Sequence, residues 1–187
     1  MSEIFVTSDT HFLHNKPFLY EPRGFASTEE MSEAIVKRWN SVVKSEDTVY
    51  HLGDICLSDT NGAIPYIQSL NGNIIWIRGN HCTDNRIDTI LSTCSNIHLI
   101  GTKETSWAYM LKSGKWSFYL SHYPTITSNN EDWKKLFCLC GHSHTKDKWA
   151  DWDKACYHVE MDAHDCYPVS LEQIKDDIRK KRLEKMP

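Results

Sequence analysis

The stretch Thr48-Val-Tyr-His-Leu-Gly-Asp54 joins a β-branched and aromatic run to a terminal Gly-Asp pair. The run predicts a β-strand, and Gly53 lets the backbone turn sharply behind it. Asp54 then follows the strand directly, so its carboxylate is aimed beyond the edge of the sheet. We infer that the rest of the chain is arranged around this carboxylate.

Further strand-like runs end in the same kind of polar residue. These runs lie at 3–8, 73–78, 116–121 and 137–140, and the side chains that follow them are Asp9, His11, Asn80, His81, His122, His142 and His144. Asp, Asn and His hold metals and transfer protons. Their repeated placement after strands predicts one shared site.

The spacing of apolar residues between the strands predicts helices. The first helix follows Ser27, which forms a capping box with Glu30, and the last helix follows Ser170. Two more helices are expected between them, at 59–70 and at 84–92. Pro65 is expected to begin or interrupt the helix at 59–70. The first half therefore has the β-α rhythm of helices packed on a largely parallel sheet. Residues 107–120 predict an antiparallel hairpin that turns at Gly114. We expect an α/β fold in a single domain spanning residues 1–187.

Residues 12–26 predict a long aromatic loop after the first strand. Such a loop either overhangs the site or packs its aromatic side chains into the core.

The composition excludes several classes of protein. The net charge of −4 over 187 residues, without a long basic run, argues against a dedicated nucleic-acid surface. No window is apolar enough to predict a membrane span or a leader, so we expect a cytoplasmic protein. The seven cysteines are expected to be reduced, with Cys138 and Cys140 packed as small buried side chains.

The polar side chains fit a pair of metal ions better than one ion. In open α/β sheets, ligands bind outside the carboxyl ends of the strands. The side chains expected to converge there are Asp9, His11, Asp54, Asn80, His122, His142 and His144. This set is too large for one small cation but suits two that share a carboxylate. It is rich in oxygen and lacks cysteine, which argues against a structural zinc site.

Five motifs, in their order along the chain, resemble those of the calcineurin-like metallophosphoesterase superfamily. They are Asp9-x-His11, Gly53-Asp54, Gly79-Asn80-His81, His122 and Gly141-His142-Ser143-His144. The longer forms at 8–14, 121–124 and 167–171 resemble its small single-domain members from bacteria and phages. The resemblance implies two facing mixed β-sheets flanked by helices, a four-layer sandwich with a dinuclear site above it.

The resemblance also implies a role for each residue. Asp9, His11, Asp54 and His144 would hold the first metal, and Asp54, Asn80, His122 and His142 the second, with Asp54 as the bridge. A hydroxide between the metals would attack phosphorus in line, and His81 would protonate or stabilise the leaving group. Relatives usually place an acidic residue after this histidine, where this chain has Cys82. Mn²⁺ is the first expectation for the metals, with Fe, Zn²⁺ or Ni²⁺ as alternatives.

The predicted activity is hydrolysis of a phosphodiester in a small or nucleotide-like substrate. A phosphomonoesterase or a nuclease would use the same chemistry, and a non-catalytic scaffold is the alternative from another class, which the complete ligand set argues against. Residues expected to contact substrate are His14, Arg23 and Tyr123. The alternatives are that His14 is a solvent-facing loop residue and that Tyr123 packs against its neighbours.

Overall fold

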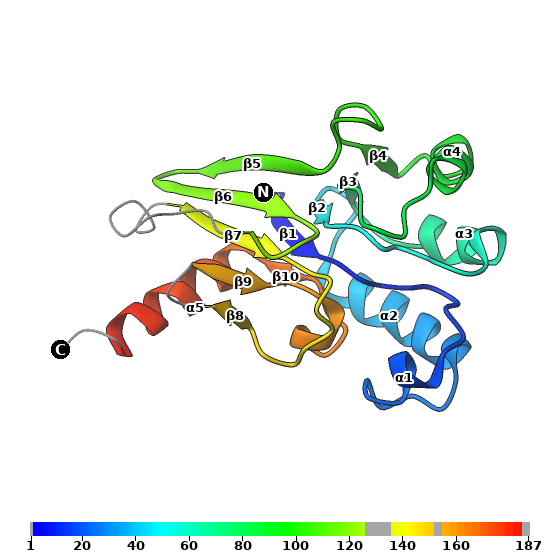
Figure 1. Ribbon diagram of the computed structural model, residues 1–187, viewed down its shortest axis with the longest axis horizontal. Helices are drawn as coiled ribbons and strands as arrows, with labels where there is room; N and C mark the ends of the chain where they lie inside the picture. Colours follow the sequence, from blue (N-terminus) through cyan, green and yellow to red (C-terminus); the bar gives the residue numbers. More distant parts are fainter. Residues whose placement is uncertain (1, 126–135, 152–154, 185–187) are drawn as a thin grey trace.

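Two mixed β-sheets of five strands each form the frame of the protein (Figure 1). The computed structural model describes residues 2–125, 136–151 and 155–184. The first sheet contains, in spatial order, β10 (Val169–Ser170), β1 (Ile4–Thr7), β2 (Thr48–His51), β3 (Asn73–Trp76) and β4 (Ile97–Leu99). The second contains β5 (Ala108–Ser113), β6 (Trp116–Ser121), β7 (Leu136–Cys140), β9 (Cys156–His158) and β8 (Trp149–Asp151).

Parallel pairing brings several strand ends to the same edge of each sheet. In the first sheet β1, β2, β3 and β4 run parallel, with Phe5 opposite Val49 and Val49 opposite Ile74. In the second sheet β6, β7 and β9 run parallel, while the outer strands β5 and β8 are antiparallel to their neighbours. The carboxyl ends of β1, β2, β3, β6 and β7 carry the polar residues that the sequence singled out.

Helices cover one face of the first sheet. Figure 1 shows α2 (Thr28–Val42), α3 (Thr60–Gln68) and α4 (Asp84–Thr93) gathered on the same side of the molecule. Phe5, Val49 and Ile74 point from the sheet into the core that these helices close. Ser27 caps α2 by accepting a hydrogen bond from the Glu30 amide at 3.2 Å, as the capping box predicts.

The opposite face of the first sheet packs against the second sheet. Val6, one residue after Phe5, faces this second core together with Leu52, Phe118 and Leu139, because successive side chains of a strand point to opposite faces. The helix α5 (Leu171–Glu184) adds Ile174 and Ile178 to the same core. The predicted fold class, two facing mixed sheets flanked by helices, is confirmed.

The aromatic segment 12–26 contains the short helix α1 (Pro17–Tyr20). Three of its four Phe and Tyr side chains pack in or against the core. Phe12 and Phe25 are buried and Tyr20 packs against the same core, whereas Phe18 is 73% exposed. The packing alternative is therefore correct for most of this segment.

One helix detail and two strands differ from the expectations. Pro65 lies inside α3 (Thr60–Gln68) and neither begins nor interrupts it. The strands β4 and β8 were not predicted, because both are short and border polar segments. Within the described ranges, no helix has the length and apolarity that a membrane span requires.

Candidate metal centre

The predicted ligands lie just beyond the carboxyl ends of five strands. Several of them hold their backbone in the left-handed region, which non-glycine residues rarely adopt. These residues are Asp9 (φ 59°), His11 (φ 49°), Asp54 (φ 56°), His142 (φ 73°) and His144 (φ 48°). Each such conformation costs about 1–3 kcal/mol and persists only where the surrounding structure enforces it. The free energy of unfolding is therefore lowered by the backbone conformations that direct these side chains into the site.

One group of donor atoms consists of Asp9, His11 and His144, whose ligand atoms all lie within 4.8 Å of one another. Asp9 Oδ1 is 3.5 Å from His11 Nε2 and 3.7 Å from His144 Nε2. Asp9 Oδ1 and both ring nitrogens of His11 are buried and have no hydrogen-bond partner among the residues that the structure describes. Buried polar atoms are almost always paired, so these atoms fit a bound cation.

The electrostatics of this group favour a carboxylate at Asp9 beside a neutral imidazole at His11. Burial alone would lower the pKa of His144, but the carboxylate of Asp162 raises it. Burial alone would raise the pKa of Asp9, but the His11 ring and further nearby imidazoles hold it well below its usual range. Burial lowers the pKa of His11, so this ring is neutral near pH 7. Charged carboxylate and neutral imidazole are the forms that bind metals.

A second group brings together Asp54, His122, Asn80 and His142. Asp9, Asp54 and His122 offer ligand atoms within 4.8 Å of one another. The Leu52 carbonyl can only accept, so His122 donates to it from Nδ1 at 2.9 Å. His122 Nε2 then presents a lone pair to Asn80 Oδ1 at 2.6 Å and to Asp54 Oδ2 at 3.4 Å. Three electron-rich atoms facing one another repel unless a cation lies between them, so these residues also fit a metal.

His142 completes this second group from the loop after β7. Its ring Nδ1 is 3.1 Å from Asn80 Oδ1, and its backbone amide donates to Asp9 Oδ2 at 2.9 Å. The two groups are therefore linked through Asp9, which is the carboxylate common to both. The assignment of Asp54 as the bridging carboxylate stays a prediction.

Close backbone packing sets the distance between neighbouring strand ends. Gly53 has φ +100°, and a Cβ at this position would lie 2.6 Å from Gly79 Cα and 2.9 Å from His122 Nδ1. Only glycine lets β2 and β3 approach in this way. The glycine before Asp54 thus provides both the turn and the close contact between the strand ends that carry Asp54 and Asn80.

His81 lies at the mouth of the site. Its backbone amide donates to Asp54 Oδ1 at 3.0 Å, while its side chain is exposed and its ring centroid is 6.2 Å from that of His11. The adjacent Cys82 is buried, accepts from the Gly79 amide at 3.2 Å and lies 3.8 Å from Asp54 Oδ1. The Cys82 side chain therefore contacts the carboxylate of Asp54, and it does not orient the His81 ring.

The three residues expected to contact substrate have different surroundings. His14 is 7% exposed, bonds to Ser58 Oγ at 2.9 Å and lies beside His11. Burial and neighbouring cationic groups lower its pKa to about 4. Tyr123 is 45% exposed and makes a T-shaped contact with His142, with ring centroids 4.6 Å apart.

Arg23 lies behind the site and does not face its mouth. Its side chain is 1% exposed, and its guanidinium donates to both carboxylate oxygens of Asp162 at 3.0 and 2.6 Å. Asp162 belongs to the 3-10 helix η1 (Met161–His164). This placement disagrees with the expectation that Arg23 contacts substrate, because the surrounding protein already engages its donors.

Sequence reasoning missed Asp162, whose Oδ2 lies 3.1 Å from His144 Nδ1. The local sequence offered one signal for Asp162, the Asp-x-His pattern of residues 162–164. This pattern repeats Asp9-x-His11 but does not follow a predicted strand.

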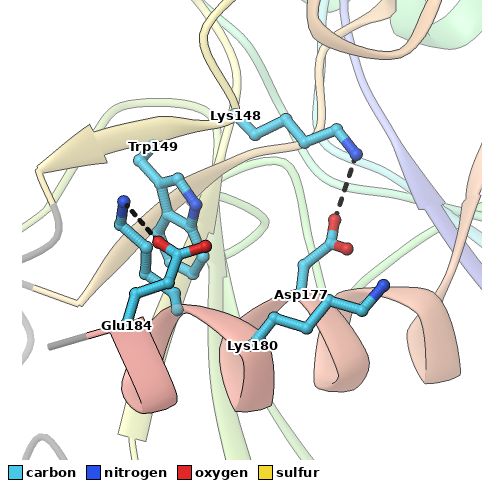
Figure 2. A pocket seen from close by; sticks show the side chains of 6 residues that line it. Lys148, Trp149, Asp177, Lys180 and Glu184 are labelled. Carbon is cyan, nitrogen blue, oxygen red and sulfur yellow. Dashed lines mark hydrogen bonds and ion pairs between the residues drawn. The ribbon is translucent and has the colours of Figure 1, made fainter. Parts of the chain in front are cut away.

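A separate pocket of about 210 Å³ lies between the start of β8 and α5 (Figure 2). Its lining residues are Lys148, Trp149, Asp177, Lys180, Lys181 and Glu184. Lys148 pairs with Asp177 at 3.1 Å, and Lys181 pairs with Glu184 at 3.2 Å. None of the predicted site residues lines this pocket, and its paired charges do not favour a second anion site.

The model of the calcineurin-like phosphoesterase family matches residues 2–185. The chain belongs to the calcineurin-like phosphoesterase family. This places the donor groups described above in a metal-dependent family, and the structure supplies candidate metal-binding clusters within the described residues.

Known relatives show how far the similarity extends. An uncharacterized protein of Methanocaldococcus jannaschii is 45% identical over 83 residues, which are 43% of this chain and 47% of that protein. The gene 66 protein of Mycobacterium phage L5 is 40% identical over 85 residues, which are 43% of this chain and 40% of the phage protein. The matched region thus spans less than half the length of each relative.

A solved structure shares the fold. A protein of unknown function from Aquifex aeolicus superposes with a TM-score of 0.70 at 22% sequence identity, over 95% of this chain and 100% of that one.

Proposed function

We propose that the chain is a metal-dependent phosphoesterase that hydrolyses phosphodiesters of small or nucleotide-like molecules with two divalent cations. The observation that carries this proposal is a pair of clusters that share Asp9, one with His11 and His144 and the other with Asp54 and His122, each with ligand atoms within 4.8 Å of one another. Membership of the calcineurin-like phosphoesterase family supports it. The complete set of donor side chains argues against a scaffold that has lost its metals.

Each proposed metal position draws on residues from several strands. Asp9, His11, Asp54 and His144 would hold one cation, and Asp54, Asn80, His122 and His142 the other. When bound, such cations supply Lewis-acid chemistry, in which water is activated for attack on phosphorus and phosphate oxygens are neutralised. The mixture of carboxylate, amide and imidazole donors suits Mn²⁺ first, with Fe, Zn²⁺ or Ni²⁺ as alternatives.

The remaining chemistry belongs to residues at the mouth. His81 is anchored through its backbone amide to Asp54, while its exposed ring is placed to protonate or stabilise the leaving oxygen. Tyr123 lies across the mouth on His142 and offers an apolar face to the substrate.

The two arginines near this edge already donate to other protein groups, and this favours a diester substrate over a monoester. Arg23 is occupied by Asp162, and Arg86 donates to Thr60 Oγ1 and to the carbonyls of His81 and Leu57. Neither guanidinium is therefore directed at the substrate. A monoester dianion depends more on such cations than a diester does, because it carries one more negative charge.

A metal-reconstituted activity screen tests this function. The chelated protein is reloaded with Mn²⁺ and assayed on bis-nitrophenyl phosphate, nitrophenyl phosphate and cyclic nucleotides. We expect turnover to need the metal and to be fastest on diesters. Asp54→Asn is expected to lose both metal and activity while its far-ultraviolet circular dichroism is retained. The control Asp88→Asn removes an exposed carboxylate on α4 that pairs with Lys103, and it should keep both.

The screen also has outcomes that refute the proposal. Wild-type protein that binds two ions and hydrolyses none of these esters would remove the hydrolase assignment and favour a scaffold. Asp54→Asn with near-wild-type turnover would remove Asp54 from the centre.

A further inference from the structure

The Arg23 guanidinium joins three segments that are distant in the sequence. It donates to Asp162 in η1 and, through Nη2, to the backbone carbonyl of Asp9 at 2.9 Å. Asp162 in turn contacts His144 in the loop after β7 at 3.1 Å. The side chains of Arg23 and Asp162 are only 1% and 8% exposed. A buried charged pair is costly unless its hydrogen bonds are well formed, and here each partner has several.

The contact between Asp162 and His144 fixes the tautomer of the imidazole. An ionised carboxylate only accepts hydrogen bonds, so the 3.1 Å contact places the proton on His144 Nδ1. The Arg23 Nη2 atom is farther from this nitrogen, at 3.5 Å. In the neutral ring, which is the form that binds a metal, His144 Nε2 is then left with a lone pair directed toward Asp9 Oδ1, 3.7 Å away.

We propose that Asp162 is the positioning residue for His144, that Arg23 holds Asp162 in place, and that this pair sets the affinity of the metal position formed by Asp9, His11 and His144. The inference rests on the proposed function, in which His144 is a metal ligand. A carboxylate behind a ligating histidine fixes the ring and makes it a stronger ligand, and its loss typically weakens metal binding about 10- to 100-fold.

The proposal predicts an asymmetric defect. His122, on the other proposed metal position, is oriented by the Leu52 carbonyl and not by Asp162. Asp162→Ala should therefore weaken one of two metal sites by about 10- to 100-fold and leave the other nearly unchanged. Arg23→Lys keeps the charge but loses the two-pronged contact, so its defect should be smaller.

The first experiment titrates Mn²⁺ into chelated wild-type, Asp162→Ala, Asp162→Asn and Arg23→Lys proteins against a competing chelator. Asp177→Ala is the matched control, because Asp177 also accepts from a basic side chain and from Tyr157 Oη but lies on α5. Equal affinities in wild type and Asp162→Ala would overturn the proposal. So would an equal loss at both metal sites, and so would the same defect in Asp177→Ala.

The second experiment needs no metal. Long-range proton–nitrogen correlation spectra of the metal-free protein, at a pH where imidazoles are neutral, report which nitrogen of His144 carries the proton. We expect Nδ1–H in the wild type and a mixture or Nε2–H in Asp162→Ala. An unchanged tautomer would overturn the positioning role. A wild-type protein that shows the expected tautomer but binds no metal would refute the proposed function alone.

Should Asp162→Ala fail to fold, Asp162→Asn decides. Its neutral amide is a weaker and less specific acceptor than a carboxylate, so it should show the same asymmetric metal defect to a smaller degree.

Discussion

Replacing Gly53 by alanine is expected to damage both the stability and the metal centre. The backbone at Gly53 has φ +100°, and the added Cβ would lie 2.6 and 2.7 Å from the Cα and N atoms of Gly79. The same Cβ would lie 2.9 Å from His122 Nδ1, which bonds to the Leu52 carbonyl. Backbone atoms cannot rotate away, so β2 and β3 must separate at the site.

The expected size follows from two contributions. The left-handed backbone costs an alanine about 1–2 kcal/mol, and overpacking against fixed atoms costs about 1–3 kcal/mol more. The free energy of unfolding should therefore fall by about 2–5 kcal/mol. For a domain of this size each kcal/mol corresponds to about 2–4 °C, so the melting temperature should fall by about 4–20 °C.

Gly24→Ala is the matched control, because Gly24 has φ +87° and nothing lies within 4 Å of the added Cβ. It should carry only the conformational cost, about 1–2 kcal/mol. Urea unfolding of both variants, with and without Mn²⁺, separates the two contributions. Equal losses in the two variants would refute the argument from close packing. Gly53→Ala protein with unaltered metal affinity would refute the link between strand spacing and the metal centre.

Three further outcomes are expected. His81→Ala should keep its metals but lose about 10²-fold in turnover on a nucleotide diester and much less on a nitrophenyl ester; equal losses would mean that the ring positions the phosphate. With Mn²⁺ at about 100-fold over the dissociation constants of both sites, each bound ion should stabilise the chelated protein by about 2.7 kcal/mol, so two ions per chain should raise the melting temperature by about 11–22 °C; a stoichiometry that stays at one in active protein would contradict the dinuclear assignment. Asp47→Ala removes the carboxylate that accepts from the Glu3 and Lys44 amides at 2.7 and 2.8 Å, and urea unfolding should show a loss of about 1.5–3 kcal/mol at neutral pH. Burial would raise the pKa of Asp47, but these hydrogen bonds hold it below its ordinary value of 3.8. The loss of unfolding free energy caused by Asp47→Ala should therefore be full above about pH 4 and should shrink as the pH falls through the folded-state pKa. A loss of unfolding free energy that does not depend on pH would contradict this role.

The residues that follow strands could be read from the sequence because strand order and strand ends are local properties. Asp54 and His122 come directly after runs whose β propensity is strong, and parallel pairing then brings their ends together. The helix starts at Ser27 and Ser170 could also be predicted from nearby residues, because a capping side chain accepts a hydrogen bond from an amide three residues later.

The residues behind the ligands could not be read in this way. Arg23 and Asp162 are 139 positions apart, and no periodicity connects a proline-rich loop to a short 3-10 helix. The aromatic composition of the loop suggested contact with substrate, whereas folding carried Arg23 beneath the site. The direction of the Cys82 side chain could not be predicted for the same reason, because it depends on the turn from Gly79 to Cys82 and on the distant carboxylate of Asp54.

The left-handed backbone at the proposed ligands has a consequence for engineering and for evolution. Glycine would relax the backbone at Asp9, Asp54 or His142, and each such change would also delete a donor atom. A library selected only for heat tolerance in the presence of a chelator should therefore drift toward glycine at these positions. The same library selected with limiting metal should keep the original residues, because stability and ligand supply pull these positions in opposite directions.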